Sequence, residues 1–457
     1  ALLSTLAARA SEGFLEADAV THYMFARAAW EEPGYLVSVW GRPVVKLLHV
    51  LPAHFAGVQG VRMTSLALAL ACALLTWRIA VGQGLRRPAV AVIFLLVQPL
   101  FFLHSFSELT ELPFATMIAA AFYCYQRQWF GPMALLCAVS PACRPEGFGF
   151  LLAAAAVLAL HGRWLWLITL PLPLLAWSWA GHLLDPREGV AWYAWLKAAW
   201  PYSGDSVYGR GHLLWFVGLL PIIVSPLVTP FLLIGIARLR PVGLLYDLQT
   251  RCRVAAMLLA VGVLIVHSLL WSAGKMASNG EARYMLIVAP FWAITAAWGY
   301  QWVVERWNLR RPVLLASFAA VAPVAANFAW RVVPLPLCDD DRLGRQIARW
   351  YQNQPDLQRE YPRVMASPPS VYYWLELSKT HPTRSADWSR ANATRPPPGT
   401  LLVWDPIYGL HNASADMVIP RELLEAHGWR HLRTFTEQEK TAEVYLSPNK
   451  KDGTPSG

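Results

Sequence analysis

Two acids near the start of the chain are the first candidates for catalysis. Glu16 and Asp18 lie in the run Phe14-Leu-Glu-Ala-Asp-Ala-Val-Thr-His22. Asp18 and His22 are four residues apart, so a helix places them on one face. Asp18 fits a general base, with Glu16 as second candidate, or an acid that caps the first turn. The two roles are compatible. Whether Asp18 and His22 hold a divalent metal, Mg or Mn, stays open.

Two further acids lie in the run Ser107-Glu-Leu-Thr-Glu-Leu-Pro113, directly before an apolar stretch. Glu111 occupies the expected cap position of the following helix, so we expect Glu108 to be freer to reach a substrate. The alternative is a solvated loop that only caps the helix. Both acids are therefore candidates for substrate binding.

Two more runs pair acids with bases. Arg144 and Glu146 belong to Arg-Pro-Glu-Gly, and they bind a substrate or form a structural ion pair. In Asn279-Gly-Glu281-Ala-Arg283-Tyr284, Glu281 and Arg283 form a surface ion pair or help to hold substrate. Arginine suits a phosphate because its planar guanidinium donates two parallel hydrogen bonds. The sequence leaves these alternatives open. The remaining candidate binding residues are Lys275, Tyr284 and Arg210.

The elements that must position these residues are membrane spans. Of the 457 residues 56% are hydrophobic and only 15% are charged, whereas a soluble domain carries about a quarter charged residues. A helix needs ~20 apolar residues to cross a bilayer. The sequence predicts about ten spans, several of them short: 62–81, 89–104, 113–126, 132–143, 147–160, 164–181, 213–237, 254–272, 284–303 and 312–331.

The basic links between spans predict the topology. Lys and Arg accumulate on the cytoplasmic side of a membrane. The links 82–88, 238–253 and 304–311 all carry arginines, and they share one side only if 132–160 forms two half-length helices that turn at Arg144–Gly147. This bias explains the net charge of +10 better than a nucleic-acid surface does, so we expect no nucleic-acid partner.

The same topology places the candidate residues on the non-cytoplasmic side. The outer segments are 1–61, 105–112, 182–212 and 273–283, and we expect their charged residues to meet at one cavity. Within the first outer loop, 43–57 reads as an interfacial helix on the bilayer. The aromatic loop 182–212 forms an interfacial belt or a wall that stacks on a sugar or lipid.

The residues 334–457 read as a small soluble α/β domain outside the membrane. We expect helices at 339–353 and 421–427. Short strands are expected at 363–366, 371–374, 400–404, 432–435 and 443–446. The six cysteines show neither metal-ligand spacing nor a disulfide framework.

The strings Glu16-Ala-Asp18, Thr110-Glu-Leu-Pro113, Arg144-Pro-Glu-Gly147 and Glu281-Ala-Arg-Tyr284 resemble the GT-C superfamily of integral-membrane glycosyltransferases, in the polyprenyl-phosphate-sugar-dependent, mannosyltransferase-like group. The resemblance covers residues 1–331. It implies a polytopic all-α membrane domain with a C-terminal α/β domain, and it places the catalytic acid at Asp18, with Glu16 second. Members often have two adjacent acids, which Ala17 interrupts here. The usual first span is missing, which we read as truncation.

The resemblance also implies the reaction. A lipid-linked sugar donor would transfer its sugar, with inversion, to an acceptor hydroxyl that the sequence does not identify. The enzyme would reside in the bacterial inner membrane, among membrane lipids, and its active site would face the periplasm or exterior. Two rivals remain. A transporter or flippase of a lipid-linked sugar also needs intramembrane charges and broken helices, but it favours related halves. A membrane scaffold would tolerate replacement of the outer acids.

Overall fold

The chain forms two compact units in the computed structural model, which describes residues 1–38, 42–184, 204–206, 208–239, 247–276, 278–308, 333–410 and 415–448. The helical unit comprises Ala1–Ser11 and Phe25–Pro334. The C-terminal unit comprises Leu335–Gly457 together with Glu12–Met24 from the first loop. The sequence did not indicate that this short N-terminal stretch groups with the C-terminal domain.

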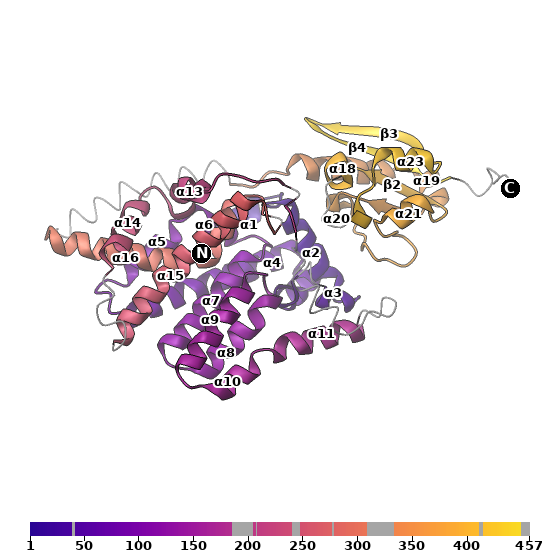
Figure 1. Cartoon of the computed structure of the whole chain (residues 1–457). Coiled ribbons are helices and arrows are strands. Elements are labelled where there is room, and N and C mark those ends of the chain that lie inside the picture. Colours follow the sequence, from indigo (N-terminus) through magenta and orange to yellow (C-terminus); the bar gives the residue numbers. More distant parts are fainter. Residues whose placement is uncertain are drawn as a thin grey trace. The chain divides into compact units, whose positions relative to one another are not determined.

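The helical unit is built from helices that coincide with the predicted spans, apart from 312–331, which lies outside the described residues (Figure 1). Two predicted spans, 89–104 and 213–237, are broken helices, and 164–181 is one span with a short interruption at 170–171. The elements in chain order are α1 (Leu2–Ala10), α2 (Ala17–Ala28), α3 (Gly34–Val37), α4 (Pro43–Gly82), α5 (Ala89–Leu96), α6 (Pro99–His104), α7 (Glu111–Gln126), α8 (Phe130–Val139), η1 (Ser140–Ala142), α9 (Gly147–Leu160), α10 (Trp164–Thr169), α11 (Leu172–Leu184), α13 (Trp215–Val224), α14 (Thr229–Arg238), α15 (Leu248–Ala273), η3 (Ala282–Val288) and α16 (Ala289–Arg306).

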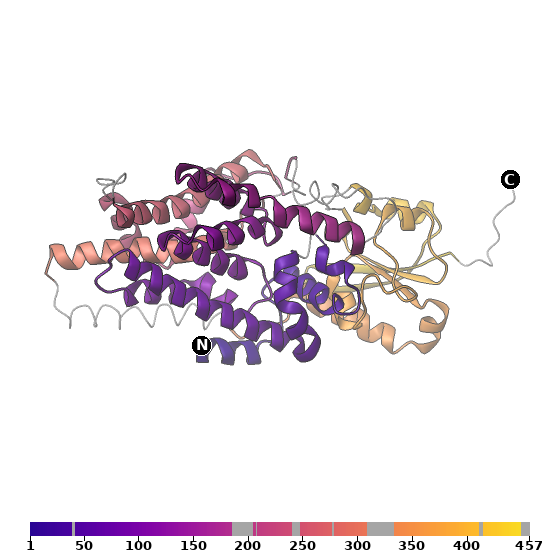
Figure 2. The same ribbon diagram turned by 90° about the horizontal axis from the view of Figure 1, so that it is seen from below.

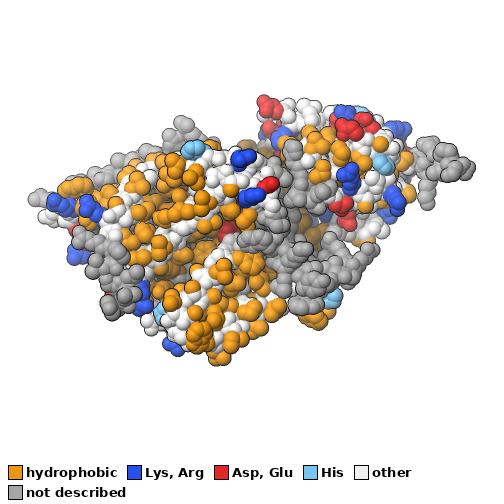
Figure 3. Space-filling view, viewed as in Figure 1, with side chains coloured by type: hydrophobic (Ala, Val, Ile, Leu, Met, Phe, Trp, Pro, Cys, Tyr) orange, Lys and Arg blue, Asp and Glu red, His pale blue; other side chains and the backbone are white. Residues whose placement is uncertain are grey.

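The surface of the helical unit is apolar, as an integral membrane protein requires. Large side chains such as Leu2, Phe55 and Leu160 are more than half exposed, and hydrophobic atoms cover much of the face seen in Figure 3. Among the described residues, three helices are long and apolar enough to cross a membrane: Pro43–Gly82, Trp164–Leu184 and Leu248–Ala273. A fourth span arises if α13 and α14, bent by 115°, count as one.

The segment 132–160 forms a helical hairpin, which confirms the predicted pair of half-length helices. Phe130 at the start of α8 packs on His161 at the end of α9, with ring centroids 5.0 Å apart. At the turn, the Ser140 hydroxyl donates to the Gly147 carbonyl oxygen at 3.0 Å. A Cβ at Gly147 would lie 2.2 Å from the Ser140 carbonyl carbon, so only glycine fits this turn.

Helix α4 includes the segment that we predicted to lie on the bilayer. The element extends to Gly82 but is interrupted by a kink at Gly57, whose φ of 59° and ψ of −149° are not helical. Before the kink, the polar side chains of Lys46 and His49 are buried, while Leu47 and Phe55 are exposed. The segment is therefore amphipathic with its apolar side outward. Its place on the bilayer surface stays a prediction.

The C-terminal unit, orange to yellow in Figure 2, contains a four-stranded mixed sheet. The strand order is β1-β2-β4-β3. Strands β1 (Arg363–Ala366) and β2 (Thr400–Trp404) are parallel, and β4 (Lys440–Leu446) runs antiparallel to β2 and to β3 (Arg430–Glu437). Every residue of β2 is buried, as expected of an apolar central strand. The helices are α18 (Asp339–Gln352), α19 (Pro355–Glu360), α20 (Pro369–Trp374), α21 (Arg390–Thr394), α22 (Pro406–Leu410), η4 (Ala415–Met417) and α23 (Arg421–Ala426).

One predicted element of this unit is wrong. We expected a strand at 371–374, but these residues belong to helix α20. Pro369 occupies the first turn, where its fixed φ favours a helix and its missing amide hydrogen costs nothing. The β-propensity of Val371 and its aromatic neighbours is overridden by this start signal. The other predicted strands and both predicted helices are confirmed.

Candidate active site

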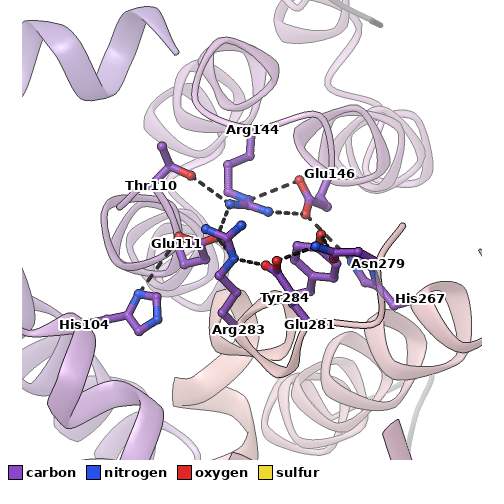
Figure 4. Close-up of polar contacts among 10 residues, drawn as sticks. All are labelled: His104, Thr110, Glu111, Arg144, Glu146, His267, Asn279, Glu281, Arg283 and Tyr284. Carbon is purple, nitrogen blue, oxygen red and sulfur yellow. Dashed lines mark hydrogen bonds and ion pairs between the residues drawn. The ribbon is translucent and has the colours of Figure 1, made fainter. Parts of the chain in front are cut away.

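A buried network of charged side chains joins three loops of the helical unit (Figure 4). Its five charged members are Glu111, Arg144, Glu146, Glu281 and Arg283. They come from the start of α7, the turn between α8 and α9, and the segment that leads into η3. The tertiary structure therefore brings three of the four predicted motifs together, while their role in binding stays a prediction.

Arg144 is the centre of the network. Its Nη1 donates to Glu111 Oε1 at 2.6 Å and to the Thr110 hydroxyl at 2.7 Å. Its Nε and Nη2 donate to the two carboxylate oxygens of Glu146 at 3.2 and 2.7 Å. This bidentate pairing is the strongest geometry that arginine forms with a carboxylate. Arg144 is 8% exposed, so the expected pair with Glu146 forms inside the protein.

Arg283 forms the second half of the network. Its Nε donates to Glu281 and lies 3.8 Å from Glu111 Oε1. Glu281 also accepts from the Asn279 side-chain amide, whose oxygen accepts from the Tyr284 hydroxyl. The predicted ion pair of Glu281 and Arg283 forms, with Arg283 8% exposed and the Glu281 side chain 29% exposed.

Two histidines that sequence reasoning missed flank the acids. His104 Nδ1 lies 4.0 Å from Glu111 Oε2, and His267 Nε2 lies 3.8 Å from Glu146 Oε1. His267 also stacks on Tyr284, with ring centroids 5.2 Å apart. The available signal for His267 was an ionisable residue inside the apolar run of α15.

The network has more acid than base. Three carboxylates face two guanidinium groups, and each guanidinium already has a carboxylate partner. The side chains of Arg144 and Arg283 are 10% and 9% exposed, whereas those of Glu146 and Glu281 are 17% and 29% exposed. The groups that this network offers to a ligand are therefore mainly hydrogen-bond acceptors. The predicted phosphate role of the two arginines stays a prediction.

Glu108 is not free to reach a substrate, contrary to our expectation. Its side chain is 1% exposed and pairs with Arg62 Nε at 2.8 Å. Arg62 Nη1 also donates to the carbonyl oxygens of Ala8 and Ser11 at 2.9 and 2.7 Å. The pair thus connects the end of α1 to α4.

Glu111 also differs from expectation in detail. The cap residue of α7 is Thr110, and Glu111 is the first residue of the helix.

Lys275 and Arg210 lie on exposed loops outside the network. Lys275 pairs with Asp205, and their side chains are 53% and 84% exposed. Arg210 is also exposed. Of the aromatic loop 182–212, residues 185–203 and 207 lie outside the described residues, so the two alternatives for this loop stay predictions.

The predicted catalytic acids belong to the C-terminal unit. Asp18 lies in the first turn of α2 and Glu16 directly precedes this helix, and both are half-buried. Asp18 lies near the hydroxyl of Tyr408: burial, the charge of Asp340 and the charge of Asp18 together raise the pKa of Tyr408. Asp18 thus lies within electrostatic range of a side chain of the C-terminal domain.

The residues around Asp18 do not make a complete metal site. His22 is 5% exposed and lies one turn after Asp18 on α2. In the described part of the chain, no three His, Cys, Asp or Glu side chains gather closely enough to hold an ion. The bound metal therefore stays a prediction.

Lys46 is a buried cation that sequence reasoning assigned to the bilayer surface. It is 1% exposed and donates to the carbonyl oxygens of Tyr35 and Ser38, the latter at 2.9 Å. Within the described ranges, no carboxylate lies within ion-pair distance of Lys46. A buried charge without a counter-charge is costly. Lys46 is therefore a candidate ligand for an anion.

Comparison with known proteins supports the architecture. No protein-family model and no curated protein matches the sequence. Among solved structures, the chain resembles the crystal structure of ArnT from Cupriavidus metallidurans bound to undecaprenyl phosphate. The TM-score is 0.58 at 12% sequence identity, and the match covers 97% of this chain and 96% of that chain. The chain therefore shares its fold with that ArnT structure over nearly its whole length.

Proposed function

We propose that the protein is a glycosyltransferase that moves a sugar from a polyprenyl-phosphate donor to an acceptor hydroxyl at the outer face of the membrane. The observation that carries this proposal is the match of both units to a transferase crystallised with undecaprenyl phosphate. A transporter does not need a C-terminal domain that forms one compact unit with the segment carrying the strongest candidate base. The buried network adds support, because its charges come from the motifs that resemble the superfamily.

The donor phosphate needs a cation that a carboxylate has not already neutralised. Lys46 meets this requirement best, since its amine is held only by backbone carbonyl oxygens among the described residues. Arg42 lies one helical turn before Lys46 and is also buried. Lys46 therefore joins Arg144, Arg283 and Lys275 as a proposed phosphate ligand. Glu146 and Glu281, the more exposed acids of the network, would accept hydrogen bonds from sugar hydroxyls.

The proposed reaction is a direct displacement. The acceptor oxygen attacks the anomeric carbon while the bond between that carbon and the phosphate oxygen breaks, and the bonding electron pair leaves with the phosphate. Ionised Asp18 takes the proton of the acceptor hydroxyl. A cationic side chain stabilises the negative charge that develops on the leaving phosphate. Attack from the side opposite the phosphate inverts the configuration.

Donor consumption by purified protein tests this function. The full chain in lipid nanodiscs is incubated with a panel of polyprenyl-phosphate sugars and candidate acceptors, and release of polyprenyl phosphate is measured. We expect Asp18→Asn to lower kcat by about 100-fold or more, because the amide cannot accept the proton. Glu12→Gln, which changes an exposed acid of the same loop, is the matched control and should keep full activity.

Two results would count against the proposal. Turnover by Asp18→Asn at the wild-type rate would reject Asp18 as the base. If the wild-type protein releases no polyprenyl phosphate from any donor but carries a lipid-linked sugar across a vesicle membrane, the transporter alternative is correct.

A further inference from the structure

The loop that carries Asp18 is attached to the C-terminal domain by contacts that the proposed reaction has not used. Glu12–Met24 forms one compact unit with Leu335–Gly457, although more than 300 residues of chain separate them. The division between the two units therefore falls within helix α2, after Met24. The N-terminal part of α2, with Asp18, belongs to the C-terminal unit.

The first contact is a backbone hydrogen bond. The Gly13 amide donates to the Leu335 carbonyl oxygen at 3.1 Å. A Cβ at Gly13 would lie 2.0 Å from the carbonyl oxygen of Pro336, so any side chain here would force the two backbones apart. Glycine is thus required for this close approach.

The second contact is a cluster of three aromatic rings. Two of them flank Asp18 in the sequence, and the third belongs to the C-terminal domain. Tyr373 of helix α20 packs edge-to-face on Phe14 and on Tyr23, with ring centroids 5.1 and 5.9 Å apart. Phe14 and Tyr23 are 5% and 4% exposed, and their centroids lie 6.2 Å apart. Such pairs contribute beyond their buried area, and they fix orientation because edge and face carry opposite partial charges.

The third observation concerns Tyr408 of the C-terminal domain. Tyr408 lies within range of the Asp18 charge, and its own backbone is held by Asp405, whose carboxylate accepts from the amides of Ile407 and Tyr408 at 2.8 and 3.0 Å. Asp405 is 2% exposed. The domain therefore presents a structured surface to the Asp18 end of α2.

We propose that the C-terminal domain is part of the catalytic machinery, with Tyr373 and Gly13 as positioning residues that hold Asp18 in place. This inference rests on the proposed function of Asp18 as the base. A base must lie within hydrogen-bond reach of the proton it takes, so a small displacement of α2 costs much of the rate. The domain then contributes to turnover through α2, and not only to folding.

The test uses the full-length protein in nanodiscs and the variants Tyr373→Ala, Tyr373→Phe and Gly13→Ala. Trp350→Ala is the matched control, because Trp350 packs on Phe435 of β3 as a comparable aromatic pair of the same domain, with centroids 5.3 Å apart. Two quantities are measured: amide hydrogen exchange of Glu12–Met24, and kcat and KM for the donor.

We expect Tyr373→Ala and Gly13→Ala to raise exchange in Glu12–Met24 by about tenfold or more. Their kcat should fall by about 10- to 100-fold with KM within about twofold of wild type. Tyr373→Phe keeps the ring and should restore both values. Trp350→Ala should leave exchange of Glu12–Met24 unchanged.

Unchanged exchange in Tyr373→Ala, or faster exchange with unchanged kcat, would overturn the inference. A loss of kcat in Trp350→Ala equal to that in Tyr373→Ala would also overturn it, since the effect would then follow general destabilisation. The exchange result is independent of activity. If the wild-type protein consumes no donor, the proposed function fails, and the exchange data alone decide whether Tyr373 and Gly13 anchor the loop.

Discussion

At the scale of single residues, the protein stabilises buried charges by pairing them. Glu111, which is 1% exposed, interacts with two guanidinium groups, those of Arg144 and Arg283. Removing one partner of a buried ion pair leaves an uncompensated charge inside the protein. This lowers the free energy of unfolding far more than the loss of an exposed ion pair does. The network therefore holds three loops in one arrangement. This arrangement also fixes the positions of Glu146 and Glu281, the two more exposed acids of the network.

We expect Glu111→Gln to destabilise the helical unit by about 3 kcal/mol, because Arg144 and Arg283 then repel each other without the charge between them. The measurement is thermal unfolding of purified protein in detergent. Lys275→Gln, which breaks an exposed pair with Asp205, is the matched control and should leave the melting temperature unchanged. Equal melting temperatures for Glu111→Gln and wild type would show that the network does not stabilise the fold.

At the scale of elements, close helix packing depends on glycine. Helices α14 and α16 approach so closely that a Cβ at Gly299 would lie 1.9 Å from the Phe231 carbonyl oxygen, and one at Gly235 would lie 2.1 Å from that of Thr295. Small residues at such crossings let two helix backbones pack tightly. Inside a membrane this packing matters because lipid is as apolar as the side chains, so the hydrophobic effect contributes little to helix association. Helix α16 follows directly after η3, which carries Arg283.

Gly299→Ala should lower the melting temperature, since the added methyl group must push α14 away at a cost of about 1–3 kcal/mol. Gly262→Ala is the control, because open space surrounds this glycine in α15. The control should be neutral or slightly stabilising, as alanine favours a helix. Identical thermal unfolding of the two variants would contradict the close packing of α14 on α16.

At the scale of the whole molecule, the fold and the charge distribution together suggest an orientation in the membrane. The fold is shared with the ArnT structure, and many large apolar side chains of the described helical unit are exposed. The arginine-rich links, including Arg86 and Arg87, are expected in the cytoplasm, and the C-terminal domain is expected outside. This orientation would place Asp18 and the sheet-containing domain on the same, non-cytoplasmic side.

Cysteine labelling tests the orientation in a Cys338→Ser background, because Cys338 is the exposed cysteine and the other five are buried. Thr383→Cys and Arg87→Cys each place a thiol at an exposed position. In intact spheroplasts, a membrane-impermeant maleimide should label Thr383→Cys and should label Arg87→Cys only after the membrane is opened. The reverse pattern would show that the topology is inverted.

Much of the local structure could be predicted from the sequence. Apolar runs and the Pro145-Glu-Gly147 turn correctly predicted the α8–α9 hairpin, and a buried apolar run predicted β2. Such elements depend on windows of about ten residues, in which periodicity and turn residues are visible. Helix α20 shows the limit even at this range, because a proline start signal there prevails over β-propensity.

Only the tertiary structure decided which charged residues meet. Glu111 and Arg144 are 33 residues apart and were both candidates, whereas Glu108 was expected to face a substrate and instead pairs with Arg62, 46 residues away. Gly13 and Tyr373 contact partners more than 300 residues away. Residue spacing determines the face of a helix on which a side chain lies. The partner on that face depends on how distant helices pack, and no local pattern encodes that packing.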